Sequence, residues 1–285
     1  MVCTCESENG YIFKNFFSFL SMKGHPVVTF LKDKIICPNR TTDNLLYVTG
    51  YLNGDEIDLV WDENIPDESK YLSLSLDTTN IKSIFGSIKK KDPCRVVVYS
   101  KTSPDDPVPL YFIGMSSGLG GLSREGSKQL SATLTKPDNT SVGFENEDSS
   151  TLIIPVKAFK QMIDSFSKCK DPVKLSFHIK DDEMVKHCLS IVSDPVEQGK
   201  GNITEKFGDI PNDLKGGVEY RISKDKIPIL TRLASMHNEG NIRVSLPSVK
   251  QNVTGEGGYA KQDTSLRLLH RFGAYGEVGV YLSSE

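Results

Sequence analysis

The sequence has no long hydrophobic run and no basic excess. Its apolar stretches fall far short of the roughly 20 residues that cross a bilayer, and the N-terminus has no basic region followed by a hydrophobic segment. We therefore expect an intracellular protein with no membrane partner. The formal net charge of −3 over 285 residues argues against a general nucleic-acid binder unless basic residues gather on one surface.

Residue patterns that hold metals are also absent. The six cysteines are scattered, which favours reduced thiols over a disulfide framework. The Cys3-x-Cys5 pair has no second Cys/His pair at zinc spacing, so we expect a frayed terminus there rather than a metal site. The five histidines never pair at metal or triad spacing. No metal and no cofactor is predicted.

Signatures of catalysis are equally scarce. The Gly-rich run at 118–124 lacks the Gly-Lys-Ser/Thr ending of a phosphate-binding loop. Acidic clusters at 55–58 and 181–183 fall where turns are expected, which outweighs a catalytic carboxylate pair. We predict no catalytic residue and no enzymatic activity.

What the sequence does contain is an internal repeat. Apolar residues at helical spacing predict a helix followed by a strand twice, at 11–23 and 27–30 and again at 154–170 and 173–179. Phe13 and Phe159 are separated by 146 positions, and so are Val27 and Val173. One such pair could be aligned by chance.

A second pair of helices has the same offset. One is predicted over 78–89, after a strand that ends at Leu76, and the other runs from Ile227 toward Gly240, after a strand that ends at Ile222. Leu76 and Ile222 differ by 146 positions, as do Ile81 and Ile227. Two pairs at one offset, in the same order, favour duplication.

Short strand-like runs separated by turn residues fill the rest of the chain. They imply antiparallel sheets with both helices of each half on one sheet face, an α+β fold of two similar domains. We place the domains at 1–138 and 150–285, joined by a polar, acidic linker at 139–149. Segments 116–127 and 194–217 are predicted to be surface loops.

Lysine and arginine gather on or beside the predicted helices although the chain is acidic overall. The candidate DNA contacts are Lys14, Lys82, Lys89, Lys90, Lys157, Lys160, Lys168, Lys224, Lys226 and Arg232. Any single lysine is explained by solvation of a helix face. Across all four helices together we favour contacts with DNA phosphates, without sequence preference, because no base-reading motif accompanies them.

With these features in place, the chain resembles the proliferating cell nuclear antigen (PCNA) family of sliding clamps. Segment 150–164 (STLIIPVKAFKQMID) resembles the start of the family's second domain, and 266–282 (LRLLHRFGAYGEVGVYL) resembles its last hairpin. The opening at 12–17 (IFKNFF) is most similar to the divergent clamps of large DNA viruses.

The resemblance implies a DNA clamp fold, a homotrimeric ring whose helices line a central hole, and a role in tethering DNA polymerase and other replication and repair proteins. It also implies a groove for partner peptides, with Leu45, Leu46, Val142, Phe144, Tyr281 and Leu282 as candidates. The chain departs from the family after Leu282, where Ser283-Ser284 replaces the usual Ala-Pro step.

Three other interpretations stay open. A viral processivity factor could use the clamp fold as a monomer or dimer that holds DNA by charge alone. A structural or scaffold protein could use the same duplicated domain, and a metabolic enzyme ranks third. If the chain is a clamp, it works at sites of DNA replication, in the nucleus or a viral replication compartment.

Overall fold

The computed structural model describes most of the 285-residue chain. The described residues are 1–20, 26–40, 46–77, 81–85, 88–89, 92–103, 106–117, 128–136, 151–166, 173–178, 188–193, 204–207, 217–222, 226–245 and 266–283. Among the helices found within these ranges, none has the length and apolarity needed to span a membrane.

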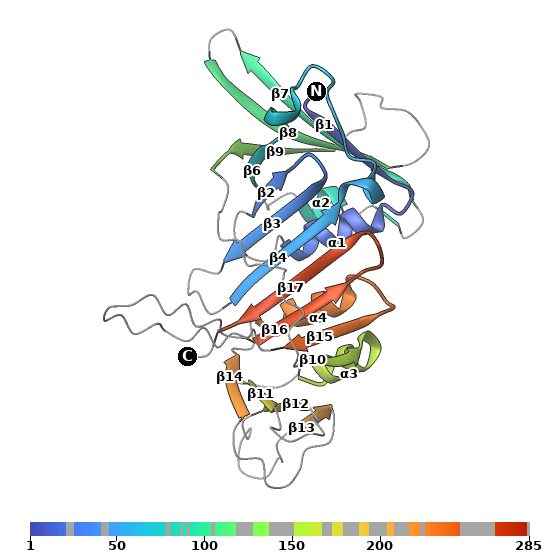
Figure 1. Cartoon of the computed structure of the whole chain (residues 1–285), viewed down its shortest axis with the longest axis vertical. Coiled ribbons are helices and arrows are strands. Elements are labelled where there is room, and N and C mark those ends of the chain that lie inside the picture. The colour runs from blue at the N-terminus through green and yellow to red at the C-terminus, as the bar shows by residue number, and fades with distance from the viewer. Residues whose placement is uncertain are drawn as a thin grey trace, which may run out of the picture. The chain divides into compact units, whose positions relative to one another are not determined.

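The order of elements repeats along the chain (Figure 1). The first half contains β1 (Cys3–Ser7), α1 (Tyr11–Leu20), β2 (Val27–Phe30), β3 (Lys34–Arg40) and β4 (Leu46–Asn53), then β6 (Leu72–Leu76), α2 (Ile81–Phe85), β7 (Cys94–Ser103), β8 (Asp106–Ser117) and β9 (Lys128–Leu134). Between β4 and β6 lie the short elements η1 (Gly54–Ile57), β5 (Val60–Trp61) and η2 (Asp67–Ser69).

The second half follows the same plan without those short elements. It contains β10 (Thr151–Pro155), α3 (Val156–Phe166), β11 (Val173–His178), β12 (Cys188–Ser193), β13 (Thr204–Phe207), β14 (Gly217–Ile222), α4 (Ile227–Ser235), β15 (Asn241–Ser245), β16 (Leu266–Arg271) and β17 (Gly276–Leu282). One strand, one helix and three strands therefore occur in that order four times, apart from the short elements.

The chain forms two compact units, each assembled from several segments. Unit 1 comprises Met1–Arg40, Val48–Ser141 and Arg271–Val278, and unit 2 comprises Thr41–Tyr47, Val142–His270 and Gly279–Glu285. Strands β4, β16 and β17 thus contribute residues to both units. The domain bounds drawn from the sequence stay a prediction, and the linker at 139–149 lies outside the described residues.

In unit 1 the strands pair antiparallel in the order β3-β2-β6-β9-β8-β7-β1-β5. Helices α1 and α2 pack on each other, and the rings of Phe17 and Phe85 stack between them with centroids 4.8 Å apart. The apolar stripes predicted from the sequence are buried: Ile12, Phe13, Phe16, Phe17 and Leu20 in α1, and Ile81, Ile84, Phe85 and Ile88 in and after α2.

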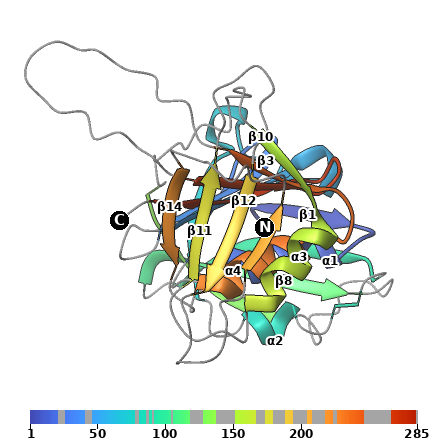
Figure 2. The same cartoon turned by 90° about the horizontal axis from the view of Figure 1, so that it is seen from below.

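Unit 2 has the corresponding arrangement. Strands β13-β12-β11-β14 form a four-stranded antiparallel sheet, whose last three strands lie side by side in Figure 2. Strand β15 pairs antiparallel with β10 and β16. Helices α3 and α4 pack on each other, and the predicted stripes are again buried: Val156, Phe159, Met162, Ile163 and Phe166 in α3, and Ile227, Leu230 and Leu233 in α4.

The N-terminus differs from expectation. Residues Cys3–Ser7 form β1, which pairs with β7 and β5, so the terminus is not frayed. Cys3 and Cys5 point into the core of unit 1 and are fully buried. Burial raises the pKa of Cys3 to about 12 and also raises that of Cys5. Only Glu6 of this strand is exposed, because β1 lies between β7 and β5.

Several element bounds differ from the sequence predictions. Helix α3 begins at Val156 because Ile154 and Pro155 still pair with β15. Helix α4 ends at Ser235, ahead of Gly240, whose φ of 100° belongs to the turn into β15. Strand β13 lies inside the segment expected to be a loop, and β8 extends to Ser117.

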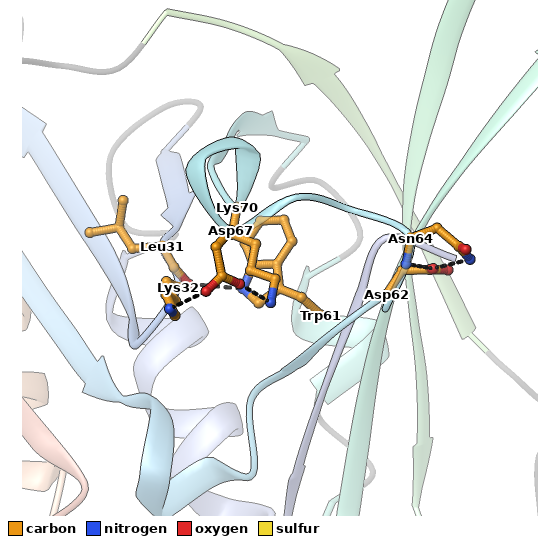
Figure 3. Close-up of polar contacts among 7 residues, drawn as sticks. All are labelled: Leu31, Lys32, Trp61, Asp62, Asn64, Asp67 and Lys70. Atoms are coloured by element: carbon orange, nitrogen blue, oxygen red, sulfur yellow. Dashed lines mark hydrogen bonds and ion pairs between the residues drawn. The ribbon is translucent and has the colours of Figure 1, made fainter.

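Polar contacts fix the short elements between β4 and β6 (Figure 3). The Asp67 carboxylate lies 2.5 Å from the Lys32 ammonium and 2.6 Å from that of Lys70, and these contacts lower its pKa to about 2. The indole N–H of Trp61, the chain's one tryptophan, donates to the Leu31 carbonyl at 3.0 Å. These contacts tie η2 and β5 to the end of β2.

Candidate nucleic-acid interface

Each unit offers the outer faces of two packed helices. Because the apolar side of every helix is buried, the polar side is what remains for a ligand. A lysine or arginine predicted from the sequence can contact DNA only if its side chain lies on one of those exposed faces.

Helix α3 presents the clearest basic side chains. Lys157 is exposed and Lys160 is half-buried, with exposed Gln161 and Asp164 on the same helix. Each lysine follows the apolar stripe by one residue, Lys157 after Val156 and Lys160 after Phe159, which turns it away from the core. Lys168 lies outside the described residues.

Helix α4 offers one half-buried cation, Arg232. Desolvation lowers the pKa of its guanidinium, which still stays charged in solution. Lys226, expected from the sequence on an exposed helix face, is only 7% exposed. It occupies the residue before α4 rather than the helix surface, with α-helical φ and ψ of −92° and −19°. Lys224 lies outside the described residues.

On α1, the Lys14 ammonium makes contacts within the protein. It donates to the Ile88 carbonyl at 2.9 Å and lies 5.5 Å from the centre of the Tyr11 ring. The sequence could not reveal this contact, because its partner is 74 residues away.

The end of α2 contributes an exposed lysine. Helix α2 stops at Phe85, and Lys89, predicted as its last residue, lies beyond it with an exposed side chain. The side chain of Lys82 and all of Lys90 lie outside the described part of the chain.

These residues can neutralise phosphates but offer little else chemically. Lys89, Lys157 and Lys160 carry point charges that suit a phosphate backbone rather than base edges. Within the residues that the structure describes, no group of three or more His, Cys, Asp or Glu could hold a metal ion.

The peptide-groove candidates are buried where the structure describes them. Leu46 is 1% exposed, Tyr281 is 6% and Leu282 is 3%, and their role in a peptide groove stays a prediction. Leu45, Val142 and Phe144 lie outside the described residues.

Two residues that the sequence analysis did not single out accompany Tyr281. The Tyr47 ring meets the Tyr281 ring edge-on, with centroids 5.6 Å apart. The Arg267 guanidinium lies 5.5 Å from the centre of the same Tyr281 ring. Strand alternation in 266–271 indicates which side chains share a face but not which of them meets an aromatic ring.

Comparison by sequence finds no relatives. No family model matches the chain, and no curated protein matches it.

Comparison by structure gives whole-length matches. The PCNA of A. fulgidus, solved with the C-terminal region of FEN-1 bound, superposes with a TM-score of 0.61 at 13% identity, over 99% of this chain and 98% of that one. The PCNA of Entamoeba histolytica superposes with a TM-score of 0.64 at 12% identity, over the full length of both chains. Helices, antiparallel sheets and whole-length superposition together show that this chain has the α+β DNA clamp fold of the PCNA structures.

Proposed function

We propose that the chain is a DNA sliding clamp, a processivity factor that encircles duplex DNA and tethers DNA polymerase and other replication and repair proteins. The observation that carries the proposal is superposition on two PCNA structures over essentially the whole length of each chain. On this proposal the protein has no active site, needs no cofactor and works where DNA is replicated, in the nucleus or a viral replication compartment.

The outer faces of the helices support DNA contact by charge alone. Lys157 and Lys89 are exposed, and Lys160 is half-buried on the same helix as Lys157. Such contacts are independent of base sequence and weaken steeply with salt. A protein that slides along duplex DNA needs contacts of this kind.

A ring requires subunits joined edge to edge, and the four-stranded sheet offers an edge. Strand β13 is the terminal strand of that sheet and pairs only with β12 among the described strands. The outward N–H and C=O groups of such a strand are a template for a strand of another chain. We propose a homotrimer closed through contacts of this type.

For partner proteins, we propose the region around Tyr281 and Leu282. The A. fulgidus structure carries the C-terminal region of FEN-1, and we propose that partner peptides bind this chain at the end of β17. Leu46, Tyr281 and Leu282 are buried in the chain alone.

Solution mass and topology test the proposal together. Light scattering at micromolar concentration should give three times the 31.6 kDa of the chain. Once loaded on DNA, the protein should stay on a closed circle and slide off after the circle is cut. A monomer or dimer that binds linear and circular DNA equally would indicate the alternative of a non-ring processivity factor.

Variants of α3 test the DNA contact itself. Replacing both Lys157 and Lys160 by Met should lower the slope of log K against log salt by about 1.8, since each phosphate contact contributes about 0.9. Asp164→Asn on the same helix is the matched control and should not lower the slope. A parent protein without salt-dependent binding would point instead to a scaffold protein.

A further inference from the structure

After α2, two hydrogen bonds join Lys89 to Asp92, and Ile88, Lys89 and Asp92 together are called the closed turn. The Lys89 N–H donates to the Asp92 carboxylate at 2.9 Å, and the Asp92 N–H donates to the Lys89 carbonyl at 3.1 Å. The Ile88 N–H donates to the carbonyl of Phe85, the last residue of α2, at 3.2 Å. These bonds hold the Lys89 backbone from both sides, while its side chain is exposed.

Two residues at the start of α1, Gly10 and Lys14, each donate a hydrogen bond to this closed turn. The Gly10 N–H donates to the Asp92 carbonyl at 2.9 Å, and the Lys14 ammonium donates to the Ile88 carbonyl at 2.9 Å. Gly10 and Lys14 are one helical turn apart, joined by the bond from the Lys14 N–H to the Gly10 carbonyl at 3.2 Å.

Gly10 shows how close the approach is. A Cβ at this position would lie 2.5 Å from the Cys94 Cβ and 2.7 Å from the Asp92 carbonyl oxygen. No side chain fits there without moving backbone. The Lys14 bond is thus one of a set that docks the turn against α1, not an isolated surface contact.

The two lysines consequently have different surroundings. The Lys14 ammonium donates a hydrogen bond to the Ile88 carbonyl and lies beside the Tyr11 ring. Lys89 is exposed on a backbone that Lys14, Gly10 and Asp92 hold in place. A fixed backbone lowers the conformational entropy that the segment carrying Lys89 loses on binding, because that segment is already ordered.

We infer that Lys14 is a positioning residue: it docks the turn of Ile88, Lys89 and Asp92 on α1 so that Lys89 is presented to a DNA phosphate, and it does not contact DNA itself. The inference rests on the proposed function. It gives Lys14 and Lys89 different roles, whereas the sequence alone predicts that both contact DNA directly.

A double-mutant cycle on the full chain tests it, with affinity for a duplex measured by fluorescence anisotropy at 0.1 M salt. A contact with a salt slope of about 0.9 contributes about eightfold at this concentration, one decade below 1 M. Lys89→Ala should therefore weaken binding about eightfold and lower the slope by about 0.9. Lys14→Met should weaken binding measurably but by no more than this, and a Lys14→Met variant that binds as tightly as the parent would overturn the inference.

The double variant separates the two roles. If Lys14 acts through Lys89, the double variant should bind about as well as Lys89→Ala alone, since the presented side chain is already absent. If Lys14 contacts a phosphate itself, the losses should multiply to about 60-fold, which would overturn the inference. Lys157→Met combined with Lys89→Ala is the matched control, and its losses should multiply.

Lys14→Arg guards against a folding defect. Its guanidinium can still donate to the Ile88 carbonyl, so binding should stay within twofold of the parent, and a loss equal to that of Lys14→Met would contradict the inference. A parent that binds DNA while Lys89→Ala has no effect also overturns it. A parent that shows no salt-dependent binding refutes the proposed function and the inference together.

Discussion

At Gly276, the first residue of β17, an added methyl group should be strongly unfavourable. Its φ of 155° is rarely adopted by residues with a side chain, and a Cβ there would lie 2.1 Å from the Tyr51 carbonyl oxygen and 3.2 Å from the Leu52 Cα. All of these neighbours are backbone of β4, so rotating a side chain relieves nothing. Gly276→Ala should be strongly destabilising.

The magnitude follows from two separate costs. The unfavourable backbone conformation costs about 1–3 kcal/mol, and overpacking costs about 1–3 kcal/mol more. We expect the free energy of unfolding of unit 1 to fall by about 2–6 kcal/mol. Gly273, in the same turn, has a φ of 65° with nothing within 4 Å of a built Cβ, so Gly273→Ala should cost only about 1–2 kcal/mol.

Urea unfolding followed by Trp61 fluorescence measures both variants. Trp61 belongs to unit 1 and is 6% exposed, so its emission should shift when that unit opens. The comparison within one turn cancels effects common to glycine replacement. Equal losses for Gly273→Ala and Gly276→Ala would refute the steric argument at Tyr51.

Two further predictions concern unit 2. His270 is fully buried, its Nδ1 lies 2.7 Å from the Leu233 carbonyl oxygen, and desolvation, with the nearby His237, lowers its pKa. The unfolded state therefore binds the extra proton first, so stability should fall as pH drops below about 6.5. His270→Gln should flatten that pH dependence in thermal melts, and a variant with the pH dependence of the parent would contradict this reasoning. Arg267→Met keeps the side-chain length but removes the charge over the Tyr281 ring. It should lower the free energy of unfolding by about 1–2 kcal/mol. An unchanged urea midpoint would show that this contact contributes nothing to stability.

The sequence was most informative where hydrophobic periodicity is strong. The stripes Phe13, Phe16 and Phe17 in α1, and Phe159, Ile163 and Phe166 in α3, leave a single face to bury, so those helices and the 146-residue offset were predictable. Helix ends were less so, because α3 starts only where β10 stops pairing. The polar strand Thr204–Phe207 was missed because it is short and its pairing with β12 is a long-range property.

The candidate sites were predicted by residue type but not by surroundings. A lysine on a helix face is equally consistent with solvent, DNA or a distant carbonyl, and the contact of Lys14 with Ile88 distinguishes these only in three dimensions. Lys226 was misjudged because it lies at the buried junction before α4. The approach of Arg267 to Tyr281 joins β16 to β17, and nothing in the spacing of the two residues signals it.

The buried cysteines of unit 1 give the protein a built-in reporter. Cys3, Cys5, Cys37 and Cys94 are each at most 3% exposed, and burial raises the pKa of both Cys3 and Cys94 to about 12. Because only the thiolate reacts, the raised pKa values of Cys3 and Cys94 make these thiols poorly reactive at neutral pH in the closed protein. Alkylation of these residues therefore proceeds through opened molecules. The rate at which Cys3 and Cys5 of β1 are alkylated therefore measures how often this unit opens, with or without DNA.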